Sequence, residues 1–203
     1  MNKEPRDIEY LVNWALEDQG LIENFVEVPR STRKTAEDYG TRISTSWVDF
    51  VPIGRSAGGD GAHPDAVTVA EALVPVDGAG RDTVEALALV VHFGRSGFRP
   101  DWCPEGPGDW VAELDKRGRV KTEPVDPDHP RGKRRPILRF EGTPAVTVDF
   151  HRRQYSAWWL ALRDLCDLIN PDLRQFRATG PRAPQAPWQA QGRVLRPDDD
   201  NAA

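Results

Sequence analysis

The chain has 203 residues, of which 38% are hydrophobic, and a formal net charge of −5. The negative charge argues against a general polyanion binder, because such proteins gain affinity from many Lys and Arg contacts to phosphates. No apolar run approaches transmembrane length, and two distant cysteines do not make a disulfide framework. We therefore expect a cytoplasmic protein with a folded core, in a reducing compartment and without membrane contact.

Two segments near the N-terminus have regular patterns. Residues 7–19 predict an amphipathic helix, with Asp7 as N-cap and Gly20 as its stop. Its apolar face consists of Ile8, Leu11, Val12, Ala15 and Leu16. Residues 43–53 are rich in β-branched and aromatic side chains, which favours a strand, although a short helix also fits.

Two further helices are predicted before residue 100. His63-Pro64-Asp65 opens the first, which runs to about Val74, because proline suits the first helical position and Asp65 the positive end of the helix dipole. Asp82 is the expected cap of the second, which ends near Phe93.

The clearest helix spans Asp149–Asn170 and ends before Pro171. Its large and apolar side chains repeat at three and four residues, which is the spacing of one buried face. They are Tyr155, Trp158, Trp159, Leu162, Leu165, Cys166 and Ile169.

The segment before this helix predicts a small antiparallel β element. Residues 110–120 suggest a hairpin, and residues 137–140 and 145–148 suggest short strands. We expect an α+β fold: a mostly helical single domain over residues 1–176, followed by a disordered tail rich in Pro and Ala over residues 177–203.

The Gly- and Pro-rich loop around residues 92–110 has two interpretations. It is either a structural loop, pinned by aromatic rings with Arg99 paired to Asp101, or an interaction site, because Arg and Trp are favoured at interfaces. The candidate interaction residues are Arg95, Arg99, Asp101 and Trp102, together with Trp188. Trp188 stands alone in the tail and either packs back on the domain or anchors a partner.

Cations concentrate between residues 116 and 153. They form either a nucleic-acid-binding face or a solvated loop that keeps a sheet edge from pairing with another chain. The candidate nucleic-acid-binding residues are Lys116, Arg117, Arg131, Lys133, Arg134, Arg135, Arg152 and Arg153.

No residue pattern predicts catalysis, a metal site or a cofactor. The glycines of residues 55–61 lack the Lys-Ser/Thr of a phosphate-binding loop, and no Gly-x-Ser-x-Gly is present. Cys103 served by His92 or His129 is the one arrangement that suggests a nucleophile, and His92 with Cys103 lacks two further ligands for zinc.

Several motifs together resemble an uncharacterised protein family of Mu-like prophages, which implies a phage setting inside a host cell. They are Tyr10-Leu11-Val12 with Trp14-Ala15, His63-Pro64-Asp65-Ala66, the run from His92 to Trp102, Tyr155 with Trp158, Ala161 and Leu162, and Pro184 with Pro187-Trp188. The order of the first helices is also similar to phage antitermination proteins of the Q type. In those proteins a DNA-reading helix pair would follow Gly97, where this chain has a Pro- and Gly-rich loop.

The expected function is that of a non-enzymatic phage accessory protein. One hypothesis is a regulator that contacts DNA or RNA polymerase through the basic face. A second is an inhibitor of a host defence complex that acts by protein–protein contacts, and a third is a small-molecule enzyme around His92 and Cys103. The oligomeric state stays open.

Overall fold

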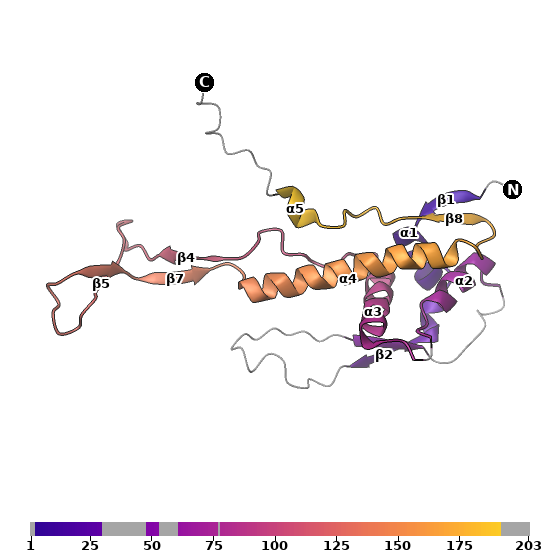
Figure 1. The fold of residues 1–203 in the computed structure, drawn as a ribbon, viewed down its shortest axis with the longest axis horizontal. Helices are drawn as coiled ribbons and strands as arrows, with labels where there is room; N and C mark the ends of the chain where they lie inside the picture. The colour runs from indigo at the N-terminus through magenta and orange to yellow at the C-terminus, as the bar shows by residue number, and fades with distance from the viewer. Residues whose placement is uncertain (1–2, 30–47, 53–60, 77, 192–203) are drawn as a thin grey trace, which may run out of the picture. The chain divides into compact units, whose positions relative to one another are not determined.

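The computed structural model describes residues 3–29, 48–52, 61–76 and 78–191 (Figure 1). The chain divides into two compact units. The helical unit comprises the described residues of Met1–Pro100 and Arg153–Ala203, and the ribbon unit comprises Asp101–Arg152.

The first helix of the helical unit begins where the sequence predicts. Strand β1 (Glu4–Asp7) leads into α1 (Ile8–Asn13), and the carboxylate of Asp7 accepts a 2.8 Å hydrogen bond from the backbone N–H of Tyr10. The helix continues as one π-helical turn, η1 (Trp14–Asp18), and ends before Gly20, whose φ is +69°. The N-cap and the stop are therefore confirmed.

A short antiparallel strand pair follows. After the 3₁₀ turn η2 (Leu21–Asn24), strand β2 (Phe25–Pro29) pairs with β3 (Val48–Pro52), with Val26 opposite Val51. The predicted strand over residues 43–53 is thus confirmed for Val48–Pro52, and its other residues lie outside the described ranges.

Helices α2 (Pro64–Ala72) and α3 (Arg81–Ser96) come next. The His63 ring caps α2 by accepting a hydrogen bond from the backbone N–H of Asp65 at 3.1 Å. The prediction that Asp82 caps α3 was wrong, because Gly80 in an extended conformation is the N-cap and Asp82 lies one residue inside the first turn. Gly97, with φ +68°, ends this helix in the left-handed conformation that suits glycine.

The longest helix, α4 (Ala145–Ile169), begins four residues before the predicted start (Figure 1). The strand expected over residues 145–148 was therefore wrong. Its β-branched residues resemble a strand, but the backbone N–H groups of Thr147 and Val148 both bond to the carbonyl of Pro144, which starts the helix. The predicted apolar stripe is confirmed at its buried positions Tyr155, Trp158, Leu162, Leu165, Cys166 and Ile169.

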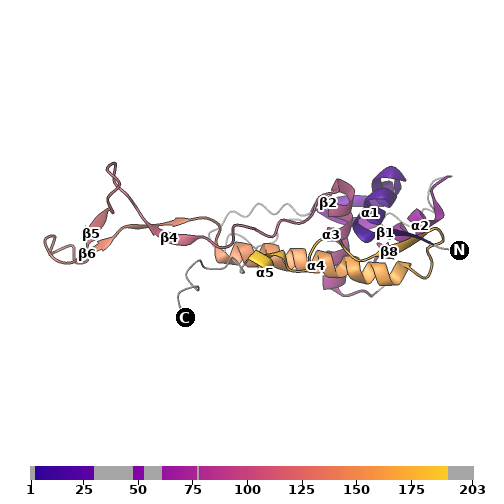
Figure 2. The same cartoon turned by 90° about the horizontal axis from the view of Figure 1, so that it is seen from above.

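The chain remains ordered beyond the predicted boundary at residue 177. Strand β8 (Phe176–Thr179) pairs in parallel with β1, as Figure 2 shows, and α5 (Pro187–Gln191) follows. Two α4 side chains hold the stretch between them: Trp159 Nε1 donates to the carbonyl of Ala183, and the Tyr155 hydroxyl to that of Pro184, both at 2.8 Å. Residues 192–203 lie outside the described ranges.

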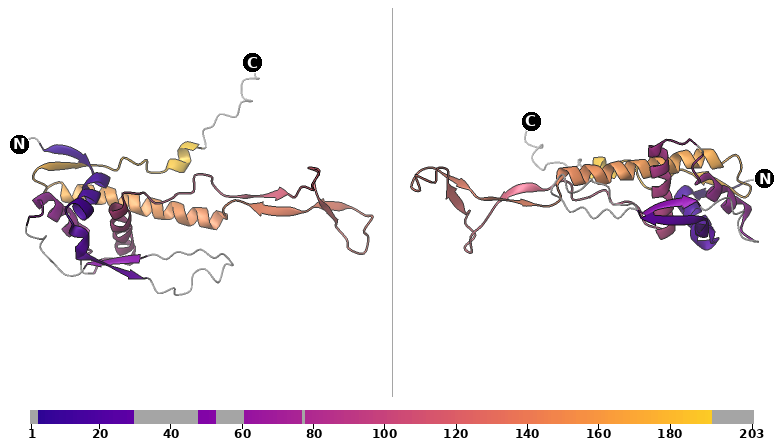
Figure 3. Two further views of the ribbon diagram at one scale, coloured as in Figure 1. Left: turned by 180° about the vertical axis from the view of Figure 1, so that it is seen from behind. Right: turned by 90° about the horizontal axis from the view of Figure 1, so that it is seen from below.

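The ribbon unit contains two antiparallel strand pairs (Figure 3). Strand β4 (Asp109–Ala112) pairs with β7 (Leu138–Glu141), and β5 (Thr122–Pro124) pairs with β6 (Arg134–Pro136). The hairpin predicted over residues 110–120 is reduced to a single bridge between Leu114 and Val120, because β4 takes β7 as its partner. Helices and small two-stranded sheets together confirm the α+β class.

Candidate functional site

The two strand pairs of the ribbon unit are continuous with each other. The backbone N–H of Glu113 donates to the carbonyl of Ile137, and the backbone N–H of Ile137 donates to the carbonyl of Lys121. Ile137 therefore connects the β4–β7 pair to the β5–β6 pair. We call residues 113–139 the basic ribbon. Strands β6 and β7 follow each other almost without a break, whereas the chain between β4 and β5 makes a side hairpin over residues 114–120.

Asp115 organises the side hairpin. Its carboxylate accepts hydrogen bonds from the backbone N–H groups of Arg117 at 2.7 Å and Arg119 at 3.0 Å, and it pairs with the Arg119 guanidinium at 3.0 Å. The backbone bond from Arg119 is the largest of the causes that lower the pKa of Asp115 below its ordinary value. The turn closes around Gly118 and presents Lys116 and Arg117 to solvent.

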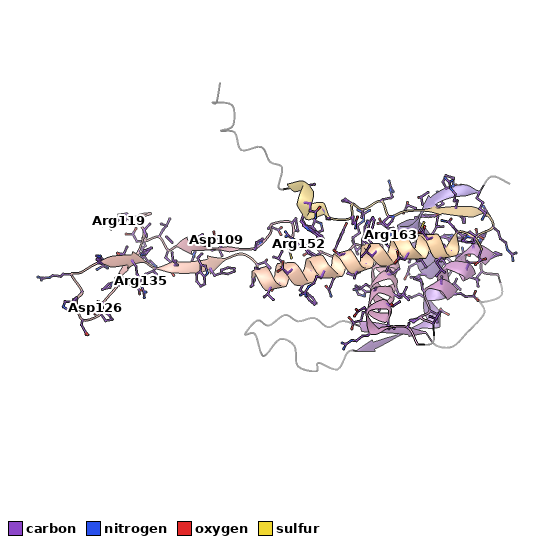
Figure 4. All side chains as sticks on the ribbon, viewed as in Figure 1. Asp109, Arg119, Asp126, Arg135, Arg152 and Arg163 are labelled. Carbon is purple, nitrogen blue, oxygen red and sulfur yellow. The ribbon has the colours of Figure 1, made fainter. Side chains whose placement is uncertain are left out.

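Asp126 has the same role in the turn between β5 and β6. It accepts the backbone N–H of Asp128 at 3.0 Å and lies 2.9 Å from the His129 ring. The turn leaves Arg131 and Lys133 exposed. In Figure 4 the labelled side chains of Asp126, Arg119 and Arg135 stand along this part of the chain.

The other cations of the basic ribbon pair with side chains or backbone of the ribbon unit itself. Lys121 pairs with Glu113 at 2.9 Å and Arg135 with Glu123 at 2.8 Å. Arg134 donates to both the hydroxyl and the carbonyl oxygen of Thr122. These contacts hold the two strands together, so Arg134 and Arg135 contribute to the ribbon's own structure.

Four of the predicted nucleic-acid-binding cations stand at the turns of the basic ribbon. Lys116, Arg117, Arg131 and Lys133 are exposed and have no ion pair within the described part of the chain. Arg152 is half-buried at the end of the ribbon unit, and Arg153 belongs to the helical unit. The basic ribbon holds nine Lys and Arg against five Asp and Glu, a net charge of +4 in a chain of −5.

One face of the β4–β7 pair is apolar. Trp110 lies opposite Phe140 with ring centroids 5.6 Å apart, and Ala112 lies opposite Leu138. The exposed fractions are 63% for Trp110, 49% for Leu138 and 38% for Phe140. Alternation along the strands places these side chains on one face, and Val111 and Arg139 on the other.

The predicted interaction residues are divided between the two units. Arg95 and Arg99 belong to the helical unit, where they pair with Glu17 at 3.5 Å and Glu9 at 2.7 Å, respectively. The expected Arg99–Asp101 pair was therefore wrong. The Asp101 carboxylate instead accepts the backbone N–H of Cys103 at 2.9 Å.

The two tryptophans of that prediction belong to different units. Trp102 is half-buried in the ribbon unit. Trp188 is half-buried in the helical unit, where its ring packs edge-on against Tyr155 with centroids 5.8 Å apart. Trp188 thus packs back on the helical unit, which is one of the two alternatives that its position in the sequence left open.

Sequence reasoning missed Asp65 as an anchor of the helical unit. This fully buried carboxylate accepts the backbone N–H groups of Arg174 at 2.7 Å and of Gln175 and Phe176 at 2.9 Å each. Burial by itself raises the pKa of Asp65, but the three hydrogen bonds and the nearby His63 outweigh it and lower the pKa. A signal was present, because Asp65 falls on the same helix face as the buried Ala66, Val69, Ala70 and Leu73.

Glu9 is a second polar residue that the sequence did not single out. Its carboxylate joins the backbone N–H of Ala183 at 3.0 Å to the Arg99 guanidinium. A cavity of about 30 Å³ lies between Glu9, Phe93 and Trp158, which is room for water but not for a metabolite. The geometry of this part of the helical unit is that of a packed core.

A group of three potential metal ligands lies in the ribbon unit. One ligand atom each from Asp101, Cys103 and His151 lies within 4.8 Å of the others. The predicted histidine partners of Cys103, His92 and His129, are not in this group. Burial, followed by the charges of Asp101 and Glu105, raises the pKa of the Cys103 thiol, which makes the free thiol a poor nucleophile.

Comparisons with known proteins matched no protein-family model, no curated protein and no solved structure. Among the described residues, no helix combines the length and the apolar character that crossing a membrane requires.

Proposed function

We propose that this protein is a non-enzymatic phage accessory protein that contacts nucleic acid through the basic ribbon. The supporting observation is that its two turns present Lys116, Arg117, Arg131 and Lys133, which are exposed and have no ion pair among the described residues. Cations without a protein partner are available to phosphates, and each phosphate contact releases condensed counterions.

Ribbon geometry favours duplex DNA as the ligand. The major groove of B-DNA admits a two-stranded β-ribbon, and a ribbon that presents cations at its turns can contact the phosphates beside the groove. The net charge of +4 on residues 113–139 leaves −9 for the rest of the chain, so repulsion keeps the acidic parts away from the duplex. Phosphate contacts carry no base information, and we expect weak sequence selectivity.

Charge reversal tests this proposal. The double variants Lys116→Glu/Arg117→Glu and Arg131→Glu/Lys133→Glu each remove two cations that bind no described residue. We expect each to weaken binding of a labelled random duplex by roughly tenfold or more at low salt, and to lower the slope of log affinity against log salt by about 1.8. Fluorescence anisotropy at several salt concentrations measures both quantities.

The matched control reverses two exposed arginines of the helical unit, Arg174→Glu/Arg177→Glu, and changes the total charge equally. An equal loss in this control would mean that total charge alone governs binding. Absence of duplex binding by the wild-type protein at low salt would refute the proposal. Arg134 and Arg135 are unsuitable for this test, because their reversal would also break bonds to Thr122 and Glu123.

The apolar face of the β4–β7 pair favours a second function, contact with a host protein complex. A two-stranded sheet is marginally stable alone, and exposed apolar patches commonly mark protein contacts. In this case Leu138→Glu/Phe140→Glu would abolish co-purification of a partner from host extract, whereas Lys116→Glu/Arg117→Glu would leave it intact. The opposite pattern would favour the basic turns as the contact surface.

A further inference from the structure

The group formed by Asp101, Cys103 and His151 has the arrangement of converging ligands. In a tetrahedral zinc site, bonds of about 2.0–2.3 Å place neighbouring ligand atoms about 3.3–3.8 Å apart. Here all three atoms lie within 4.8 Å of one another, so small side-chain rotations would bring them onto one ion. We propose that these three residues bind a divalent transition-metal ion of the zinc class.

The same geometry argues against a catalytic relay. In a relay the imidazole stands between nucleophile and carboxylate, and two hydrogen bonds plus the ring width separate the outer atoms by about 6 Å or more. The Cys103 sulfur and the Asp101 carboxylate lie closer than that. The Cys103 sulfur and the Asp101 carboxylate therefore converge on one point with the His151 ring and do not lie on opposite sides of that ring.

The three side chains also select the kind of metal. A thiolate and an imidazole suit zinc and its neighbours, whereas calcium and magnesium require oxygen ligands almost exclusively. The Asp101 carboxylate and a Cys103 thiolate together balance the charge of a divalent ion. Three ligands from the chain leave a fourth tetrahedral position for solvent or another group.

The position of the group indicates that a bound metal would stabilise the ribbon unit. Asp101 and Cys103 lie at the beginning of the ribbon unit, and His151 lies one residue before its end. Of residues 101–152, all of which are described, Cys103 at 7% exposure and Val148 at 1% are the only buried apolar side chains. A unit with so little core commonly depends on a metal or a disulfide for stability.

The strands at the base of the ribbon already bring these two ends together. Pro107 and Thr143 form a parallel bridge, and the backbone N–H of Gly108 donates to the carbonyl of Thr143 at 2.7 Å. A metal on Asp101, Cys103 and His151 would close the ribbon beyond this bridge, and would link the loop at residues 101–103 to the second turn of α4. This stabilisation is independent of the nucleic-acid contact proposed above.

Cobalt titration of the full chain tests the site. We expect metal-free wild-type protein to bind about one Co²⁺ per chain, with thiolate-to-cobalt charge-transfer absorption and the strong visible bands of tetrahedral cobalt, and Zn²⁺ to displace it. Cys103→Ser and His151→Ala should each lower the affinity by about 100-fold or more, since loss of even a supporting group costs 10- to 100-fold.

The matched controls are Cys166→Ser and His129→Ala, which remove a buried thiol of the helical unit and an exposed histidine of the ribbon unit. Both should bind Co²⁺ like the wild type. Retention of the thiolate signal in Cys103→Ser, or its loss in His129→Ala, would overturn the assignment.

A wild-type measurement covers the case in which the ligand variants fail to fold. Alkylation of native protein, followed by peptide mass mapping, should show that Zn²⁺ protects Cys103 and leaves the modification rate of Cys166 unchanged. Equal rates for Cys103 with and without Zn²⁺ would refute the site, whichever variants fold.

Discussion

Replacement of Asp65 should cause the largest loss of stability of any single polar change in the helical unit. The carboxylate has 0% exposure and accepts three backbone N–H groups from the segment that follows α4. Hydrogen bonds to a charged acceptor contribute about 1.5–3 kcal/mol each, and a donor left buried without a partner costs about 1–3 kcal/mol. Because such contributions are not additive, we expect Asp65→Ala to lower the free energy of unfolding by about 3–5 kcal/mol.

The asparagine variant should lose less. Its single carbonyl oxygen can replace one carboxylate oxygen, while its amide donors would face a backbone N–H of residues 174–176. We expect Asp65→Asn to cost about 2 kcal/mol, near one charge-assisted bond. For a chain of this size 1 kcal/mol shifts the melting temperature by about 2–4 °C. The expected decreases are therefore roughly 6–20 °C for Asp65→Ala and 4–8 °C for Asp65→Asn.

Thermal unfolding followed by circular dichroism measures these shifts, with Asp172→Asn as the control. Asp172 lies in the same segment but is exposed, and its substitution should shift the melting temperature by no more than about 2 °C. Melting of Asp65→Ala within 2 °C of the wild type would refute the anchoring role.

The pH dependence provides an independent check. The pKa of Asp65 in the folded protein lies below its ordinary value of 3.8, so its stabilisation is complete above the range in which the unfolded chain titrates. It is lost as the pH falls through the folded pKa. Wild-type stability should therefore decline in acid more steeply than that of Asp65→Asn. Parallel declines would mean that Asp65 has the same pKa in both states.

Three further predictions concern packing in the helical unit. Gly94→Ala should destabilise by about 1–3 kcal/mol in chemical denaturation, because a Cβ at this α3 position would overlap the Val12 side chain of α1. Gly180→Ala meets open space and should be nearly neutral. Trp158→Ala, which removes a side chain of 3% exposure, should cost about 3–5 kcal/mol, and wild-type-like melting would show that the α4 stripe is not core. Truncation after Thr179 should lower the melting temperature markedly, because it removes the acceptors of two α4 side chains and the Ala183 N–H that donates to Glu9. Truncation after Gln191 keeps all three bonds, and this variant should melt at a higher temperature than the variant that ends at Thr179.

Local sequence was sufficient for α1 and most of α4, and for some of the helix ends. Apolar residues at three- and four-residue spacing predicted α1 and most of α4, since burying one face is what stabilises a helix of this kind. Asp7 and Gly20 also had the expected roles, because capping and left-handed stops depend on a residue and its immediate neighbours. The four cations of the candidate interface could be identified from the sequence, because charge is a property of the side chain itself.

Tertiary structure alone decided which distant segments meet. The parallel pairing of β1 with β8 joins residues about 170 positions apart, and no local pattern encodes such a partner. Strand pairing also determined which cations have partners within the ribbon, because Arg134 and Arg135 bind residues of the neighbouring strand while Lys116 and Arg117 stand at a turn. Asp101, Cys103 and His151 likewise become one group only when the ends of the ribbon unit come together, since ligand geometry depends on distance in space and not on spacing along the chain.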